Sequence, residues 1–266
     1  MTHKFIYSSV PQKDNILELS DFCPLDFFDI PPLPFFSNES ISFLNDLSNL
    51  LVKKEDIRKY PELMALGFWL RKGNLVSIMQ DWKKKISKDE IVVARGVAFH
   101  VAPSNVDSIF LYSWALSLLS GNLNLIRVSR KKSIQLEILF QIIEKLFKSH
   151  KAVADRNKIF SYEHNSTVSG YFSINSDLRI IWGGDETINL IKNIKSKPTT
   201  KDVTFSDKSS LAIISSKNYL SLNESAKEKL AHSFYNDAYW FNQKACSSPG
   251  RVYFVGNQAA KASKIF

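Results

Sequence analysis

Cys246 is the residue of this sequence best placed for covalent chemistry, because it lies on an expected loop. The loop follows a long helical pattern and precedes an apolar run at 251–255. Most of its other residues are polar or turn-forming: Asn242, Gln243, Lys244, Ser247, Ser248, Pro249 and Gly250. A thiol held between two rigid elements is both fixed and reachable, and Lys244 would favour the attacking thiolate. The alternative is a buried cysteine that packs as a small hydrophobe.

A second candidate site is Pro103-Ser104-Asn105, between an expected strand at 96–102 and an expected helix at 105–120. Ligands of open α/β sheets bind at the carboxyl ends of the strands. The Asn105 side-chain amide could donate a hydrogen bond to a developing oxyanion there. A simple helix-capping role for Asn105 is the alternative.

Arg127-Val-Ser-Arg130 follows the next expected strand, at 123–128. Two guanidinium groups at a strand end can grip a phosphate through paired hydrogen bonds. A solvated strand end fits the same residues equally well.

Gly183-Gly184 lies between an expected strand at 178–182 and an expected helix at 185–194. Such a turn lets backbone amides meet a phosphate at a helix N-terminus. The pattern is not GxGxxG, and Asp185 and Glu186 would repel a close phosphate, so the dinucleotide signal is weak.

Metal-binding and serine-nucleophile patterns are missing from the sequence. It contains two cysteines and five histidines without CxxC or HxxxH spacing, and no GxSxG elbow. We therefore expect no metal, and His100 is interpreted as a structural residue within its strand.

The elements that must position these residues alternate between strand and helix after residue 90. Residues 1–40 form an irregular arm rich in proline and phenylalanine, followed by helices at 41–53, capped by Ser40, from Pro61, and at 75–85. Strands are expected at 91–94, 96–102, 123–128, 178–182, 203–205, 211–214 and 251–255. Helices are expected at 105–120, 133–149, 185–194, 222–240 and from about 258. This alternation predicts an α/β fold with a doubly wound, Rossmann-type parallel sheet over about 91–205.

The composition indicates a folded protein with a real core. Hydrophobic residues make up 44% of 266, and two cysteines give no disulfide framework, so we expect a reduced, cytoplasmic protein. The N-terminus lacks the apolar stretch of a signal peptide, and no apolar run is long enough to span a membrane. The net charge of +9 is spread over scattered lysines, which makes nucleic-acid binding the weakest of the functional hypotheses.

Four stretches in order resemble the acyl-CoA reductase family typified by the reductase subunit of the bacterial bioluminescence fatty-acid reductase complex (LuxC-type), within the aldehyde dehydrogenase superfamily. They are Arg95-Gly-Val-Ala-Phe-His-Val-Ala-Pro-Ser-Asn105, Ser120-Gly-Asn-Leu-Asn-Leu-Ile-Arg-Val-Ser129, Ile181-Trp-Gly-Gly-Asp-Glu-Thr-Ile188 and Asn242-Gln-Lys-Ala-Cys-Ser-Ser-Pro249. The resemblance extends from about residue 60 to the end. Each motif alone is modest, and their shared order makes the match specific.

The resemblance implies NADPH-dependent reduction of a fatty acyl-CoA or acyl-protein thioester to an aldehyde. Cys246 would form the thioacyl-enzyme, and Asn105 with a backbone amide would hold the oxyanion. The cofactor would lie along Pro103, Ser104, Arg127, Ser129, Arg130, Gly183 and Gly184. An acyl-activating synthetase is the partner expected by analogy, and the oligomeric state is left open.

Two departures from the superfamily refine this expectation. Thr204 stands where hydrolytic members carry a general-base glutamate, so water activation is not expected. Arg130 stands near the adenosine ribose, where many NAD-dependent members have an acidic residue, which favours NADPH over NADH.

The resemblance also implies a longer protein, because the family continues well past the nucleophile and this sequence ends twenty residues after Cys246. By this resemblance, the chain divides into an arm with helices at 1–90, a nucleotide-binding domain at 91–205 and the start of an incomplete catalytic domain at 206–266. The alternative function is therefore a catalytically impaired, nucleotide-binding remnant of such a reductase.

Overall fold

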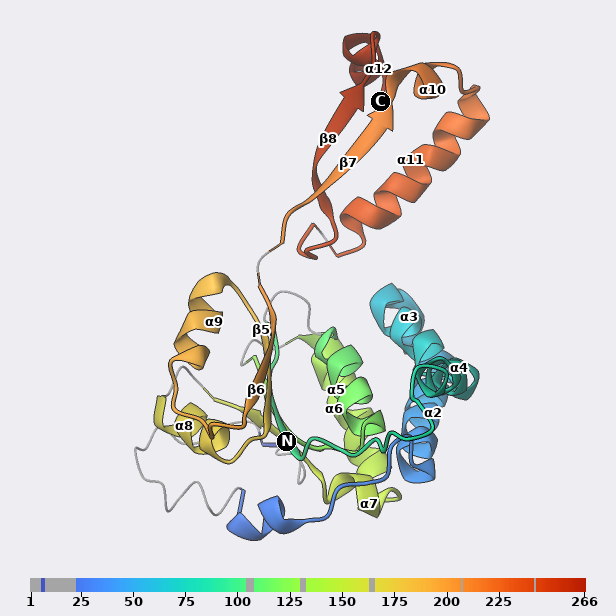
Figure 1. Cartoon of the computed structure of the whole chain (residues 1–266). Helices are drawn as coiled ribbons and strands as arrows, with labels where there is room; N and C mark the ends of the chain where they lie inside the picture. The colour runs from blue at the N-terminus through green and yellow to red at the C-terminus, as the bar shows by residue number, and fades with distance from the viewer. Residues whose placement is uncertain are drawn as a thin grey trace. The chain divides into compact units, whose positions relative to one another are not determined.

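The computed structural model describes residues 6–7, 23–103, 108–129, 133–162, 166–206, 208–241 and 243–266. The chain divides into two compact units, residues 1–206 and 207–266, which are treated separately below (Figure 1). The first contains the large sheet and its helices. Within its described residues, the second contains a two-stranded sheet and three helices.

A six-stranded parallel sheet forms the centre of the first unit, in the order β1-β4-β3-β2-β5-β6. The chain runs outward through β2, β3 and β4 and then returns to the other side of β2 for β5 and β6. This reversal confirms the predicted doubly wound topology and creates a switch point between β2 and β5. The strands are β1 (Ile6–Tyr7), β2 (Val97–Val101), β3 (Leu123–Val128), β4 (Asn157–Ser161), β5 (Leu178–Trp182) and β6 (Lys201–Phe205).

Helices cover both faces of this sheet (Figure 1). On one face lie α5 (Phe110–Leu119), α6 (Ile134–Phe147) and the short α7 (Lys151–Ala154). On the other lie α8 (Ser166–Ile174) and α9 (Asp185–Lys192). Successive side chains of a strand point to opposite faces of the sheet. Ile126 therefore packs under α5 and α6, whereas Leu125 packs under α8 and α9.

The segment before β2 adds a helical layer to the α5–α6 face. This layer contains α2 (Asn38–Lys53), η2 (Glu55–Lys59), α3 (Pro61–Trp69) and α4 (Lys72–Lys83). The preceding η1 (Leu25–Asp29) packs on the other face, where Phe27 joins the core under α8. Phe43 of α2 joins this layer to the core, with its ring 5.8 Å from Trp114 and 5.7 Å from Phe147. Pro61 begins α3 as predicted. The predicted cap of α2 is wrong: Ser37 accepts from the Ser40 amide, and the helix begins at Asn38.

Residues 91–94 form no strand, contrary to prediction. Ile91 is 89% exposed, and the chain enters the sheet only after the Arg95 and Gly96 amides donate to Asn122 Oδ1. A β-branched run needs a partner strand, and in the described part of the chain no strand pairs with this one. A helix was expected at 105–120, and the observed helix α5 runs over Phe110–Leu119. Residues 104–107, at the start of the expected helix, lie outside the described part of the chain. Strand β4 and helix α8 were not predicted.

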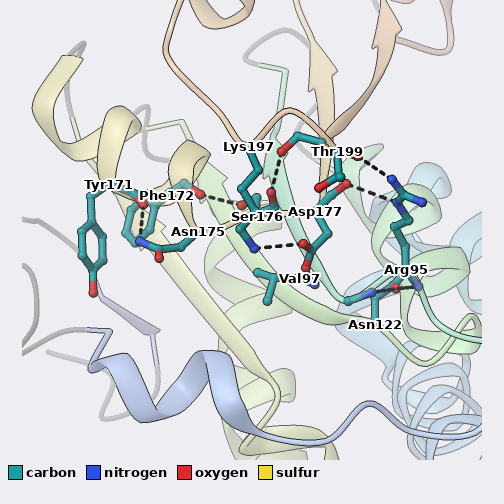
Figure 2. Close-up of polar contacts among 12 residues, drawn as sticks. Arg95, Val97, Asn122, Tyr171, Phe172, Asn175, Ser176, Asp177, Lys197 and Thr199 are labelled. Atoms are coloured by element: carbon teal, nitrogen blue, oxygen red, sulfur yellow. Dashed lines mark hydrogen bonds and ion pairs between the residues drawn. The ribbon is translucent and has the colours of Figure 1, made fainter.

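The amino edge of the sheet is fixed around Asp177, which precedes β5 (Figure 2). Its carboxylate accepts from the Val97 amide at 2.9 Å and from Lys197 Nζ at 2.9 Å. Gly96 enters β2 with φ of +120°, and a Cβ there would strike the Asp177 carboxylate. These bonds set where β2 and β5 begin, and hence where their functional ends emerge.

A buried polar network joins the three central strands β2, β3 and β4. The Asn124 amide nitrogen donates to Asn157 Oδ1 at 3.0 Å, and Trp114 Nε1 donates to the same oxygen. Asn124 Oδ1 lies 3.0 Å from His100 Nε2 and can only accept, so Nε2 carries the hydrogen and donates this hydrogen bond. His100 Nδ1 is buried without a partner among the described residues. Burial lowers the pKa of His100 from 6.5 to about 4, and the Asn124 bond opposes this only in part.

We expect acid to destabilise the fold through His100. The folded state keeps the imidazole neutral, whereas the unfolded chain protonates it, so stability is lost as pH falls from about 6.5 toward 4. Between pH 7 and pH 5 this amounts to about 2 kcal/mol of unfolding free energy. Urea unfolding of the protein and of His100→Gln, which keeps a donor for Asn124, should show a smaller pH dependence in the variant. Equal losses in both proteins would assign the effect to other groups.

The second unit is built on two parallel strands, β7 (Ser210–Ser215) and β8 (Pro249–Val255). Between them run α10 (Ser216–Leu220) and α11 (Glu224–Tyr239), and α12 (Ala259–Ile265) follows. Phe254 of β8 packs against Tyr219 and Phe266, with ring centroids 6.0 and 5.5 Å apart. In the described ranges of both units, no helix is long and apolar enough to cross a bilayer.

Candidate active site

The carboxyl edge of the large sheet brings together three of the predicted binding segments. Pro103 follows β2, Ser129 follows β3 and Gly183-Gly184 follow β5. The Ala102 amide donates to the Arg127 carbonyl at 2.9 Å, which extends the β2–β3 pairing up to Pro103. Because β2 and β5 flank the switch point, these segments surround the edge where doubly wound folds bind ligands.

The Gly183-Gly184 turn leads directly from β5 into α9. The Gly183 amide donates to the Phe205 carbonyl at 3.2 Å, and Gly184 is the N-cap of the helix. A Cβ on Gly183 would lie 3.0 Å from the Thr187 side chain, so the tight turn favours glycine. The N-terminus of α9 offers amide donors to an anion, although Asp185 and Glu186 occupy its first turn.

Arg127 occupies the carboxyl end of β3, on the α8 face of the sheet. Its guanidinium carbon lies 4.9 Å from the centroid of the Tyr162 ring, and Nη2 is 3.4 Å from the Tyr162 carbonyl. Arg127 Nε is buried and has no hydrogen-bond partner among the residues that the structure describes. The sequence analysis does not identify Tyr162 as a site residue, because it does not predict β4, the strand that Tyr162 follows.

Thr204 lies on β6 opposite Ile181 of β5 and is half-buried. One residue further along, the rings of Phe205 and Trp182 stack with centroids 3.9 Å apart. The neighbouring strand ends thus carry a hydroxyl and two aromatic rings. A threonine hydroxyl cannot act as a carboxylate base.

Cys246 lies in the second unit, on the connection between α11 and β8. The Ser248 amide donates to the Ala245 carbonyl at 3.0 Å, which makes Cys246 the second residue of a four-residue turn. Ser210 Oγ donates to the Cys246 carbonyl at 2.7 Å and ties the turn to the start of β7. Gln243, just before it, adopts φ of +59°, a costly conformation for a residue other than glycine. Cys246 is exposed, so its thiol is reachable on a fixed turn.

The other cysteine, Cys23, is buried, whereas Cys246 is exposed. Cys23 is fully buried in the core under α8, and its carbonyl accepts from the Tyr171 hydroxyl at 2.7 Å. Burial raises the pKa of its thiol to about 12, although Lys158 opposes the shift. Cys23 is therefore a protonated core residue, which makes it a natural control for Cys246.

Several predicted site residues lie outside the described part of the chain. These are Ser104, Asn105 and Arg130. Within the described residues, the structure gathers Pro103, Arg127, Ser129, Gly183 and Gly184 at one edge of the sheet. Cys246 belongs to the other unit. No group of three or more histidine, cysteine, aspartate or glutamate side chains arranged to hold a metal occurs among the residues with described positions.

Comparison with solved structures identifies this as the fold of the aldehyde dehydrogenases. A glyceraldehyde-3-phosphate dehydrogenase from Methanocaldococcus jannaschii, solved with NADP, superposes with a TM-score of 0.68 at 14% identity, over 100% of this chain and 62% of that one. Lactaldehyde dehydrogenase from Escherichia coli gives 0.62 at 15% identity, over 94% and 54%. An NAD+ complex of an aldehyde dehydrogenase from Bacillus cereus gives 0.57 at 12% identity, over 85% and 48%.

Within that fold, the chain belongs to the acyl-CoA reductase (LuxC) family, whose profile matches residues 71–264. A long-chain acyl-protein thioester reductase from Aliivibrio fischeri is 24% identical over 184 residues. The match covers 68% of this chain and 36% of that protein, so the chain spans about a third of the relative's length. This membership agrees with the family indicated by the sequence motifs.

Proposed function

We propose that the chain acts in the reduction of a fatty acyl thioester, carried by coenzyme A or by a protein, to an aldehyde. The observation that carries the proposal is an exposed cysteine on a closed turn that Ser210 ties to the start of β7, in a chain of the acyl-CoA reductase family. The relative from Aliivibrio fischeri is named for action on acyl-protein thioesters, which supports the substrate class.

Cys246 would act as the nucleophile. Its thiolate attacks the thioester carbonyl and a new carbon–sulfur bond forms. The original carbon–sulfur bond breaks, and its sulfur leaves as a thiolate with the electron pair of that bond. The turn fixes where the nucleophile stands, because the Ser248 amide closes the turn onto the Ala245 carbonyl and the Ser210 hydroxyl donates to the Cys246 carbonyl. Asn105 would donate to the oxyanion formed in this step, together with a backbone amide near Cys246.

The thioacyl group must survive until reduction, and the chemistry of Thr204 suits this. A glutamate at this place could deprotonate water and hydrolyse the intermediate. Thr204 offers only a half-buried hydroxyl. We therefore assign the lack of a carboxylate at residue 204 to protection of the acyl-enzyme.

The residues at the carboxyl edge fit a nicotinamide dinucleotide. Arg127 presents a guanidinium with a buried, unpaired Nε, and the close-packed turn at Gly183 opens onto the amides of α9. When bound, reduced nicotinamide dinucleotide supplies the hydride that converts the thioester to an aldehyde. In the proposal, Pro103, Ser104, Ser129 and Gly184 line the cofactor, and Arg127 and Arg130 bind its phosphates.

We expect NADPH to bind more tightly than NADH, because Arg130 would attract a 2′-phosphate that an acidic residue repels. Arg130→Glu should reduce the preference by about ten- to a hundredfold, as expected for a lost charge-assisted contact. Calorimetric titration of both nucleotides into both proteins measures it, with Lys131→Glu as a neighbouring charge control. Equal affinities in the unsubstituted protein would remove the basis for NADPH.

The decisive experiment for the nucleophile is acylation of Cys246 by a labelled long-chain acyl-CoA. It tests the thiol without requiring reduction, so the result does not depend on the cofactor. Three further parts of the proposal rest on the resemblance and on the cysteine content alone. They are a nucleotide-binding domain at 91–205 followed by the start of a catalytic domain, an acyl-activating synthetase as partner, and a cytoplasmic place of action.

A further inference from the structure

Among the described residues, Arg127 has no counter-ion at the carboxyl edge of the sheet. It is half-buried, and no described carboxylate forms an ion pair with it. Its contacts are neutral: the face of the Tyr162 ring and, at 3.4 Å, the Tyr162 carbonyl. A partly desolvated guanidinium with a buried, unpaired Nε gains from an anion more than a solvated one does.

The register of the sheet explains why Tyr162 reaches Arg127. Arg127 of β3 pairs with Phe160 of β4, so Tyr162 is its diagonal neighbour on the same face. Long side chains bridge this diagonal, and the guanidinium extends along the strand direction over the ring. Tyr162 itself is 3% exposed, and its hydroxyl lies 3.1 Å from Ser169 Oγ on α8. The helix therefore fixes the ring, and the ring fixes the arginine.

We infer that Tyr162 is the positioning residue of a phosphate site at the end of β3: its ring orients the Arg127 guanidinium toward the 2′-phosphate of the dinucleotide. The inference rests on the proposed cofactor site and deepens it, since it names a residue that sets the preference for a 2′-phosphate.

A neutral ring suits this task better than a carboxylate would. Burial raises the pKa of Tyr162 to about 12, with the Ser169 bond and Arg127 opposing the shift, so the phenol is uncharged at physiological pH. A carboxylate would hold the guanidinium but cancel its charge. The aromatic face restricts its orientation by a cation–π contact and leaves the full positive charge for a phosphate.

The test uses the whole chain and two probes, 2′,5′-ADP and 5′-ADP, which differ in the 2′-phosphate. We expect the protein to bind 2′,5′-ADP more tightly. Tyr162→Leu, which removes the ring, should reduce this preference by about three- to thirtyfold while leaving 5′-ADP binding nearly unchanged. Tyr162→Phe, which keeps the ring and loses only the hydroxyl, should retain most of the preference. In Arg127→Gln, the further change Tyr162→Leu should have no additional effect.

Arg127→Lys provides a second route that leaves Tyr162 in place, in case Tyr162→Leu fails to fold. It keeps the charge and loses the planar group that stacks on the ring, so the preference should fall severalfold. An undiminished preference in Arg127→Lys, an equal loss for both probes in a folded Tyr162→Leu protein, or additive effects of the two substitutions would overturn the inference. Acylation of Cys246 is measured separately: if it proceeds while the protein lacks any 2′,5′-ADP preference, the positioning role is refuted and the acyl-transfer function stands.

Discussion

Incubation of the full chain with a radiolabelled long-chain acyl-CoA should place the label on Cys246 and leave Cys23 unmodified. Only a thiolate attacks an acyl group. With a pKa of about 12, roughly one Cys23 thiol in 10⁵ is ionised at neutral pH, and the side chain is fully buried. Cys246 is exposed on its turn, so an acyl thioester can approach it. Mass spectrometry of the digested protein identifies the labelled residue.

The two cysteines supply matched variants for this experiment. Cys246→Ser should abolish labelling, whereas Cys23→Ser should retain it in protein that remains folded. Hydroxylamine should release the label from the unsubstituted protein, because it cleaves thioesters under mild conditions. Labelling that survives in Cys246→Ser would exclude this thiol as the nucleophile. No labelling of folded protein would favour the alternative function, nucleotide binding without acyl transfer.

The contact between Ser210 and the turn shows what the sequence could not reveal about this site. Small and turn-forming residues around Cys246 were sufficient to predict an accessible loop. The hydrogen bond that pins the loop comes from Ser210, thirty-six positions earlier, through the parallel pairing of β7 with β8. This contact depends on the register in which β7 pairs with β8. A local sequence pattern does not determine the register between strands that are distant in the chain.

Strand prediction succeeded for apolar runs that are buried on both faces of the sheet. It failed where the apolar or polar character of a segment does not match its burial. β3 and β5 were predicted within their observed bounds because buried parallel strands are nearly continuous apolar runs. β4, Asn-Lys-Ile-Phe-Ser, begins with polar residues whose partners lie inside the protein, and Asn157 belongs to the buried network. Ile91 to Val93 read as a strand but are largely exposed. Local composition cannot identify either exception.

Arg179 is the clearest buried charge that no local sequence pattern indicates. It lies within the apolar strand β5, at 2% exposure, and pairs directly with Asp202 of β6. Its Nε and Nη2 atoms bind the two carboxylate oxygens at 2.7 and 2.8 Å. Nη1 donates to the Ile191 and Ile194 carbonyls at 2.8 and 3.1 Å, at the C-terminal end of α9. One side chain thus joins two strands to the helix that begins at Gly184.

Asp202→Ala should therefore be among the most destabilising single substitutions in the first unit. It leaves the Arg179 guanidinium buried without a counter-charge, and breaking a buried pair on one side costs about 3–5 kcal/mol. We expect the lower end, because the Asp202 side chain is 22% exposed and water can partly replace it. Urea unfolding at neutral pH measures the loss. Asp81→Ala, which removes a solvent-exposed pair with Lys84 in α4, is the control and should have no measurable effect.

The same substitution also tests whether Arg179 holds α9 in place. With its orienting carboxylate gone, the guanidinium should bind the last carbonyls of α9 less firmly, and amide hydrogen exchange in α9 should accelerate more than in α5 on the opposite face. Replacing both partners, as Arg179→Met with Asp202→Leu, should recover much of the global stability, since no uncompensated charge remains. It should not restore protection at the end of α9, because no donor replaces the guanidinium there. A loss below about 1 kcal/mol in Asp202→Ala, or unchanged exchange in α9, would show that the pair contributes little to stability or to the helix.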